Sequence, residues 1–119
     1  MGLRWEALIV NSVDPSRLGR WWAESLGWDA SEDEEGDVFL TPPDSGMPEV
    51  QFLAVPDGKK AINRLHLDFR PDDQIIEVSR LLELGAVHAD VGQDTASWVV
   101  LADPEGNEFC VLESRAPMG

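Results

Sequence analysis

The sequence predicts an α+β protein built from two tandem copies of a βαβββ unit. A branched apolar run, a capped helix with an apolar stripe and three short strands follow each other twice along the 119 residues. Both predicted helices end on a Leu-Gly pair, Leu26-Gly27 and Leu84-Gly85. Two copies are too few for a solenoid, so the units must bury each other's sheets. We therefore expect one curved, cupped mixed sheet with the helices outside, in a single domain over residues 1–119.

The first module is predicted at residues 3–56. An apolar run from Trp5 reads as a buried strand, and Asp14 with Pro15 supplies an N-cap and a first-turn proline for a helix that Gly27 ends. Short strands are expected after this helix at residues 27–30, 38–41 and 50–55.

The second module is predicted at residues 63–114. Its first strand is NRLHLDF at residues 63–69, and Asp72-Asp73 caps the following helix, which Gly85 ends. The apolar stripe of this helix comprises Ile75, Val78, Leu81 and Leu82. Strands are then expected at residues 86–89, 97–102 and 108–112, with DPEGN forming a type I turn between the last two.

The two faces of NRLHLDF differ in chemistry. Alternation places Leu65, Leu67 and Phe69 toward the core, and Arg64, His66 and Asp68 on the opposite face. The polar face is open to three interpretations: a solvent face, a satisfied structural cluster, or the floor of a site.

The formal net charge of −14 excludes some partners. Nucleic acid and anionic membrane surfaces require clusters of Lys and Arg, so neither is expected. No apolar run approaches the length of a membrane span, and no signal peptide is predicted. The single cysteine, Cys110, favours a reducing cytoplasm. The acidic run at residues 31–37 lacks the spacing of a calcium loop and is interpreted as a solvated turn.

Three stretches in this order resemble the vicinal oxygen chelate superfamily, and in particular its small glyoxalase-like and bleomycin-resistance-like branch. They are DPSRLGRWWAESLGW at residues 14–28, NRLHLDFRPDD at 63–73 and WVVLADPEGNEFCVL at 98–112. The resemblance implies the glyoxalase/bleomycin resistance/dioxygenase fold, in which each module lines half of the cupped sheet.

The resemblance also implies four slots for ligands of one divalent metal ion. In this sequence the slots hold His66, Ala7, Cys110 and either Leu53 or Gln51. His66 is the one good ligand in place, whereas zinc usually takes at least three protein ligands and magnesium several oxygens. We therefore expect no metal and no other cofactor. Catalytic residues cannot be assigned.

The preferred hypothesis is a cytoplasmic glyoxalase-like protein that binds a small organic molecule in the cup without a metal. Relatives implied by the resemblance are often homodimers, and the Trp-rich first helix suits such a contact. Two other hypotheses stay open: a divalent-metal lyase, isomerase or dioxygenase, and a non-catalytic interaction module. Whether a reaction is catalysed is left open. The candidate pocket residues are His66, Arg64, Gln51, Leu53, Ala7, Trp98 and Cys110.

Several candidates also have purely structural interpretations. His66 could be a structural imidazole bonded to Asp68, and Arg64 could form an ion pair with Asp68. Cys110 is expected to be an inert buried thiol. Trp98 faces either the helix or the cup, where it would stack on a planar ligand.

Overall fold

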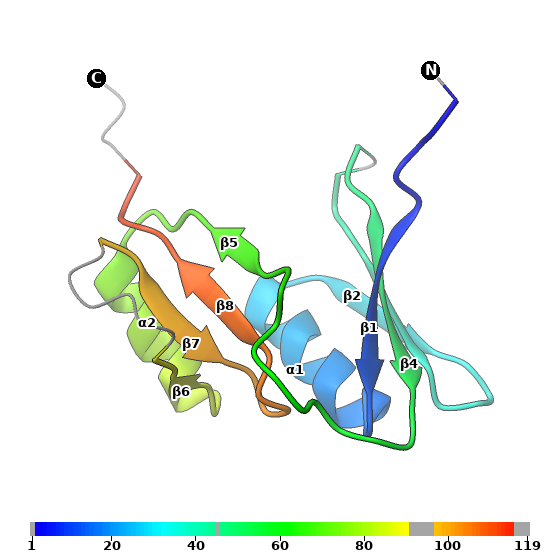
Figure 1. Ribbon diagram of the computed structural model, residues 1–119. Helices are drawn as coiled ribbons and strands as arrows, with labels where there is room; N and C mark the ends of the chain where they lie inside the picture. Colours follow the sequence, from blue (N-terminus) through cyan, green and yellow to red (C-terminus); the bar gives the residue numbers. More distant parts are fainter. Residues whose placement is uncertain (1, 45, 91–96, 116–119) are drawn as a thin grey trace. The chain divides into compact units, whose positions relative to one another are not determined.

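The computed structural model describes residues 2–44, 46–90 and 97–115. The chain divides into two compact units, Met1–Gly58 and Lys59–Gly119, and the described residues of each form a four-stranded mixed sheet and one helix (Figure 1). The predicted α+β class and the predicted order of elements are confirmed in both halves. The elements are β1 (Ala7–Ser12), α1 (Pro15–Leu26), β2 (Asp29–Glu32), β3 (Val38–Thr41), β4 (Glu49–Ala54), β5 (Leu67–Phe69), α2 (Gln74–Glu83), β6 (Val87–His88), β7 (Val99–Ala102) and β8 (Glu108–Val111).

The two sheets have the same topology. The strand order is β1-β4-β3-β2 in the first unit and β5-β8-β7-β6 in the second. In each sheet the first strand runs parallel to the last strand of its unit, and the other neighbours are antiparallel. The helix of each unit joins the first strand to the second strand, which lies at the opposite edge of the sheet. The remaining strands follow one another directly.

The ends of α1 follow from its capping residues. The Asp14 carboxylate accepts a hydrogen bond from the backbone N–H of Arg17 at 3.2 Å, and Pro15 occupies the first helical position. Gly27 ends the helix at φ 71°, a left-handed conformation that glycine adopts at little cost.

The buried face of α1 carries the two adjacent tryptophans. Leu18, Trp21 and Trp22 are all buried, and the two indole rings meet edge to face with centroids 5.0 Å apart. Because both rings are buried, they offer little exposed area for the homodimer contact that the Trp-rich helix led us to expect.

The apolar stripe predicted for α2 is only partly correct. Asp73 caps the helix by accepting from the N–H of Ile76 at 3.1 Å, and Leu81 is buried, but Ile75 is 78% exposed. In the first turn it is Gln74 that reaches the sheet: its side-chain amide donates to the carbonyls of Val111 and Ser97. The side chain of Gln74 therefore makes the contact with the sheet that the 3.6-residue period predicted for Ile75.

Strand β5 is shorter than predicted, and its apolar face is less buried. The strand was expected over residues 63–69, but it begins at Leu67, and Leu65 is 89% exposed. The chain before β5 is held by side chains instead of a ladder: the backbone N–H of Asn63 donates to Glu108 at 3.2 Å. Phe69 is the half-buried member of the predicted face, in edge-to-face contact with Phe109.

Two acidic turns are stabilised by the first residue of each. Asp33 accepts from the backbone N–H groups of Glu35 and Asp37, which confirms an exposed turn within the acidic run. The predicted DPEGN turn is also present, with the N–H of Gly106 donating to the carbonyl of Asp103 at 2.9 Å.

A steric contact fixes how closely α1 approaches β3. A Cβ atom added to Gly19 would lie 2.5 Å from Cγ1 of Val38. We expect Gly19→Ala to lower the free energy of unfolding by about 1–3 kcal/mol through overpacking, even though Ala is the better helix former. Urea denaturation measures the change. The penalty should shrink in a Val38→Ala background; a stabilising Gly19→Ala would contradict the close approach.

Candidate functional site

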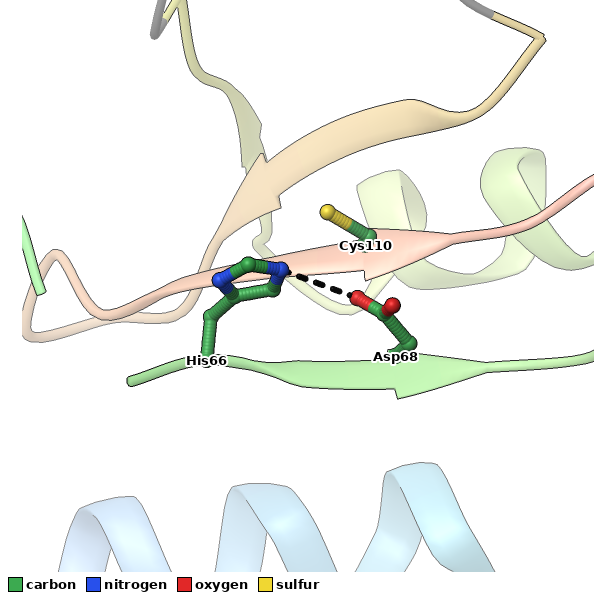
Figure 2. A group of neighbouring side chains, drawn as sticks. All are labelled: His66, Asp68 and Cys110. Carbon is green, nitrogen blue, oxygen red and sulfur yellow. Dashed lines mark ion pairs between the residues drawn. The ribbon is translucent and has the colours of Figure 1, made fainter. Parts of the chain in front are cut away.

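The sequence-predicted residue His66 lies in a three-residue cluster on the second unit. His66 immediately precedes β5, Asp68 lies within β5, and Cys110 lies on the neighbouring strand β8 (Figure 2). The parallel register places Asp68 directly opposite Cys110. His66 and Asp68 are two residues apart and extend from the same side of the chain, so the pairing of β5 with β8, together with the residue before β5, brings the three side chains to one face. We call His66, Asp68 and Cys110 the polar cluster.

The polar cluster is compact and partly open to solvent. Nε2 of His66 lies 3.1 Å from Oδ1 of Asp68, and the two side chains are 47% and 48% exposed. One ligand atom from each residue, including Sγ of Cys110, lies within 4.8 Å of the others. Cys110 itself is buried. A molecule bound at this face would therefore meet the imidazole and the carboxylate first.

The thiol of Cys110 is held in its protonated form. Burial, the negative charge of Asp68 and a hydrogen bond from the thiol to that carboxylate together raise its pKa to about 11, and burial has the largest effect. Nucleophilic cysteines need the opposite, a neighbouring group that favours the thiolate. The polar cluster is thus a set of hydrogen-bonding groups around one carboxylate, with no activated nucleophile.

In the first unit, other residue types occupy the positions that correspond to the polar cluster. Ile9 lies opposite Gln51 in the β1–β4 pair, as Asp68 lies opposite Cys110 in the β5–β8 pair. The shared register makes Gln51, rather than Leu53, the counterpart of Cys110. Gln51 is half-buried and donates to Glu49 on its own strand at 2.9 Å. Ala7, the counterpart of His66, has no polar side-chain atom.

The other predicted pocket residues are not members of the polar cluster. Ala7, Gln51 and Leu53 belong to the first unit, with Leu53 half-buried opposite Asn11. In the second unit, Arg64 is exposed in the bend before β5, and Trp98 is 42% exposed just before β7. The carboxylate of Asp68 pairs with His66, as one structural interpretation expected, and not with Arg64.

Asp68 is the site residue that sequence reasoning missed. Its position on the polar face was apparent from alternation with His66, but it was assigned only as a structural partner, by a hydrogen bond to His66 or an ion pair with Arg64. The signal that could have identified it was the repeat itself. Aligning the two modules by their capping aspartates, Asp14 and Asp73, places Asp68 beside the chelating slot of His66 and opposite that of Cys110.

Glu108, which lies two residues before Cys110, is committed to a separate contact. Its carboxylate lies 2.9 Å from Nζ of Lys59 and also accepts from the backbone N–H of Asn63. Burial raises the pKa of Glu108, but the hydrogen bonds from Lys59 and Asn63 outweigh it and hold the pKa below its usual value. This carboxylate anchors the chain before β5 and so helps to position His66.

An open groove of about 530 Å³ lies in the first unit, and its lining includes none of the predicted pocket residues. It is lined by the chain before β1 and by the β3–β4 connection, and Trp5 and Met47 supply its exposed apolar surface. None of its lining residues belongs to the polar cluster.

The metal implied by the resemblance can be tested against the donors present. In the second unit, an imidazole, a carboxylate and a thiol lie within 4.8 Å of one another. This mixture suits a borderline ion such as Zn²⁺ and not a hard ion such as Mg²⁺, which needs several oxygens. In the first unit, the slot residue Ala7 supplies no ligand, and Gln51 offers only an amide, which already donates to Glu49. The four-donor set across both modules is therefore absent from this sequence, whereas a three-donor set within one module is present.

Comparison with known proteins identifies the family. A family model described as a glyoxalase-like domain matches residues 7–112, nearly the whole chain. The chain belongs to the glyoxalase-like family. No curated protein matches this sequence.

Solved structures show the same fold for this glyoxalase-like protein. A glyoxalase/bleomycin resistance protein/dioxygenase family enzyme from Burkholderia phytofirmans has a TM-score of 0.72 at 17% identity, over 92% of this chain and 97% of that chain. The trypanothione-dependent glyoxalase I of Leishmania major has a TM-score of 0.64 at 17% identity, over 94% and 87%. A bleomycin resistance determinant encoded on transposon Tn5 has a TM-score of 0.60 at 15% identity, over 96% and 100%.

The glyoxalase/bleomycin resistance/dioxygenase fold is thereby established, although identities this low carry no activity over to this chain. In the described parts of the chain, no helix has the length and apolarity that a membrane crossing requires.

The raised pKa of Cys110 predicts slow alkylation. At pH 8 an ordinary thiol has a far larger thiolate fraction than one with a pKa of about 11. We expect native protein to react with iodoacetamide about 100-fold more slowly than the urea-unfolded chain, and the native rate to rise steeply as the pH approaches 11. Mass spectrometry follows the reaction. Asp68→Asn should accelerate it, whereas the exposed Asp72→Asn should not. Native and unfolded rates that are equal at pH 8 would contradict the protonated thiol.

Proposed function

We propose that this glyoxalase-like protein binds a small organic molecule at the polar cluster, without a resident metal ion. The observation that supports this proposal best is the cluster itself, because β5, the residue before it and β8 bring three different polar groups to one face and leave two of them about half exposed. A preformed face with few, convergent polar groups is typical of small-molecule sites.

The polar cluster favours a ligand with both donor and acceptor groups. Asp68 can accept a further hydrogen bond or balance a positive charge, and the thiol of Cys110 already donates to it. Since Nε2 of His66 is directed at Asp68, a ligand would meet Nδ1 of the imidazole. Trp98 and Arg64, both exposed in the same unit, are proposed to add a stacking surface and a cation.

We also propose a cellular location and an oligomeric state. The lone buried thiol of Cys110 fits a reducing compartment, which supports a cytoplasmic location. We propose a homodimer because members of the superfamily that the sequence resembles are often homodimers. The dimer contact would use surface residues other than Trp21 and Trp22, whose rings are buried.

A divalent-metal-dependent lyase, isomerase or dioxygenase is the second candidate. It is favoured by one observation, the three donors within 4.8 Å of one another. Metal analysis of protein purified without chelator separates the two candidates. Stoichiometric zinc, nickel, iron or manganese that is lost in His66→Ala would contradict the metal-free part of the proposal.

Ligand binding can be tested with a matched histidine control. Screening aromatic drugs, hydroxy acids and thiol adducts by thermal shift should reveal compounds that raise the Tm of the wild-type protein. For such a compound, we expect His66→Ala and Asp68→Asn to weaken binding at least about 10-fold, the loss of one or two charge-assisted hydrogen bonds. Isothermal titration calorimetry measures the affinity.

His88→Ala is the control, because His88 is exposed on β6. It should bind as the wild type does. A compound whose affinity is unaffected by both His66→Ala and Asp68→Asn does not bind at the polar cluster. If no compound in the panel raises the Tm, the result would favour a non-catalytic interaction module instead.

A further inference from the structure

We propose that the groove in the first unit is a second binding site, which takes a small organic amine in its protonated form. The groove has a volume of about 530 Å³, which is within the range of small-molecule sites. It lies at the end of the first sheet where the chain before β1 runs beside the connection between β3 and β4 (Figure 1). Its lining residues are separate from the polar cluster, so this inference does not rest on the ligand proposed there.

The apolar wall of the groove is built around an exposed indole ring. Trp5 is 70% exposed, and its Nε1–H donates to the carbonyl of Ala7 at 3.2 Å. The ring is therefore held against its own chain while much of its surface stays in contact with solvent. Met47, which is 46% exposed, adds a polarisable thioether. Three prolines complete this wall, Pro42, Pro43 and Pro48.

The groove offers a ligand few hydrogen-bond donors. The indole N–H of Trp5 is already bonded, and the three prolines have no backbone N–H. The backbone N–H groups of Gly46 and Met47 both donate to Asp44, to its carboxylate at 2.9 Å and to its carbonyl at 3.1 Å respectively. A ligand that needs donors from the protein is therefore poorly served here.

Acceptors and negative charge are present along the same groove. The charged lining residues are two carboxylates, Glu6 and Glu49, and one guanidinium, Arg4, which leaves a formal charge of −1. Oε1 of Glu49 accepts from the side-chain amide of Gln51 at 2.9 Å, and a carboxylate has further lone pairs for a ligand. A monocation balances the charge of the lining, and the net charge of −14 on the whole chain attracts cations to its surface.

The sheet register brings the indole and one of the carboxylates to neighbouring positions. Ala7, whose carbonyl holds the ring of Trp5, lies directly opposite Glu49 in the parallel β1–β4 pair. Paired strands are about 4.8 Å apart, so the aromatic surface and the negative charge are within reach of one small molecule.

These features together favour an ammonium group attached to an aromatic or aliphatic body. A primary ammonium donates three hydrogen bonds and accepts none, which matches a groove rich in acceptors. The body of the ligand packs on Trp5 and Met47, and the face of an indole also attracts a cation. An anionic ligand would meet two carboxylates and one guanidinium, so the groove disfavours it.

Three probes of similar shape separate the effect of charge from that of stacking. They are phenethylamine, which is protonated at neutral pH, the neutral phenethyl alcohol and the anionic hydrocinnamate. Each is titrated into full-length ¹⁵N-labelled protein, and the indole N–H signal of Trp5, assigned with Trp5→Phe, is followed by NMR. We expect the amine to shift this signal saturably and to bind at least about 10-fold more tightly than the alcohol, with the acid weaker still.

Variants locate the site. Trp5→Ala and Glu49→Gln should each weaken phenethylamine binding about 5- to 10-fold in calorimetry. Glu34→Gln is the matched control, because it removes the same charge from an exposed position in the same unit outside the groove. It should bind as the wild type does, and so should His66→Ala. Circular dichroism confirms folding, and the exposed Glu6→Gln replaces Glu49→Gln if the latter is unfolded.

Four results would overturn the proposal. The first is an alcohol that binds as tightly as the amine, and the second is wild-type affinity in folded Trp5→Ala. The third is an equal loss of affinity in Glu34→Gln and Glu49→Gln, which would reduce the effect to overall charge. The fourth is a Trp5 signal that responds to protein concentration and not to the amine, which would indicate a second copy of the chain in the groove.

The same measurements keep the two sites distinguishable. Phenethylamine binding that is lost in His66→Ala and kept in Trp5→Ala would assign the amine to the polar cluster and would contradict the second site. Binding that is lost in Trp5→Ala and kept in His66→Ala supports the groove and leaves the polar cluster to be judged by its own test.

Discussion

The parallel pairing of β5 with β8 is the constraint on which the site depends. In this register Asp68 lies opposite Cys110, and His66 lies two residues before Asp68 on the same side of the chain. The hydrogen bonds of the sheet thus place the carboxylate beside the thiol, and the residue that precedes β5 adds the imidazole. The same proximity explains why the thiol keeps its proton, because burial and the adjacent carboxylate both oppose the thiolate. Moving the register by one residue would turn Asp68 and Cys110 to different faces.

The two units show that a repeated fold need not repeat its chemistry. Both have the same strand order and a parallel first-to-last pair, which depend on apolar patterning, helix caps and turns. The side chains at the matching positions are unrelated: Ala7, Ile9 and Gln51 in one unit stand where His66, Asp68 and Cys110 stand in the other. A hydrophobic core constrains the positions that face it and leaves the opposite face of a strand free to vary. The site therefore belongs to the second unit, although the fold belongs to both.

Much of the fold could be predicted from local signals. Asp14, Pro15 and Gly27 bound the first helix because capping and left-handed backbone are local properties of the chain. The length of β5 and the exposure of Ile75 could not be predicted in this way. Both are decided by side chains distant in sequence, Glu108 holding Asn63 in the first case and Gln74 reaching Val111 in the second. The role of Asp68 was missed for a related reason: its partner Cys110 becomes a neighbour only through the sheet register.

An engineered disulfide tests this register most directly. Adjacent strands are about 4.8 Å apart, within the range that a disulfide spans. In Asp68→Cys, the new thiol faces Cys110, and we expect mild oxidation to form an intrachain disulfide in most molecules, as measured by mass spectrometry of the non-reduced protein. In Leu67→Cys, the new thiol lies opposite Phe109 on the other face, and no intrachain disulfide should form. A disulfide in Leu67→Cys together with free thiols in Asp68→Cys would contradict the register and, with it, the polar cluster.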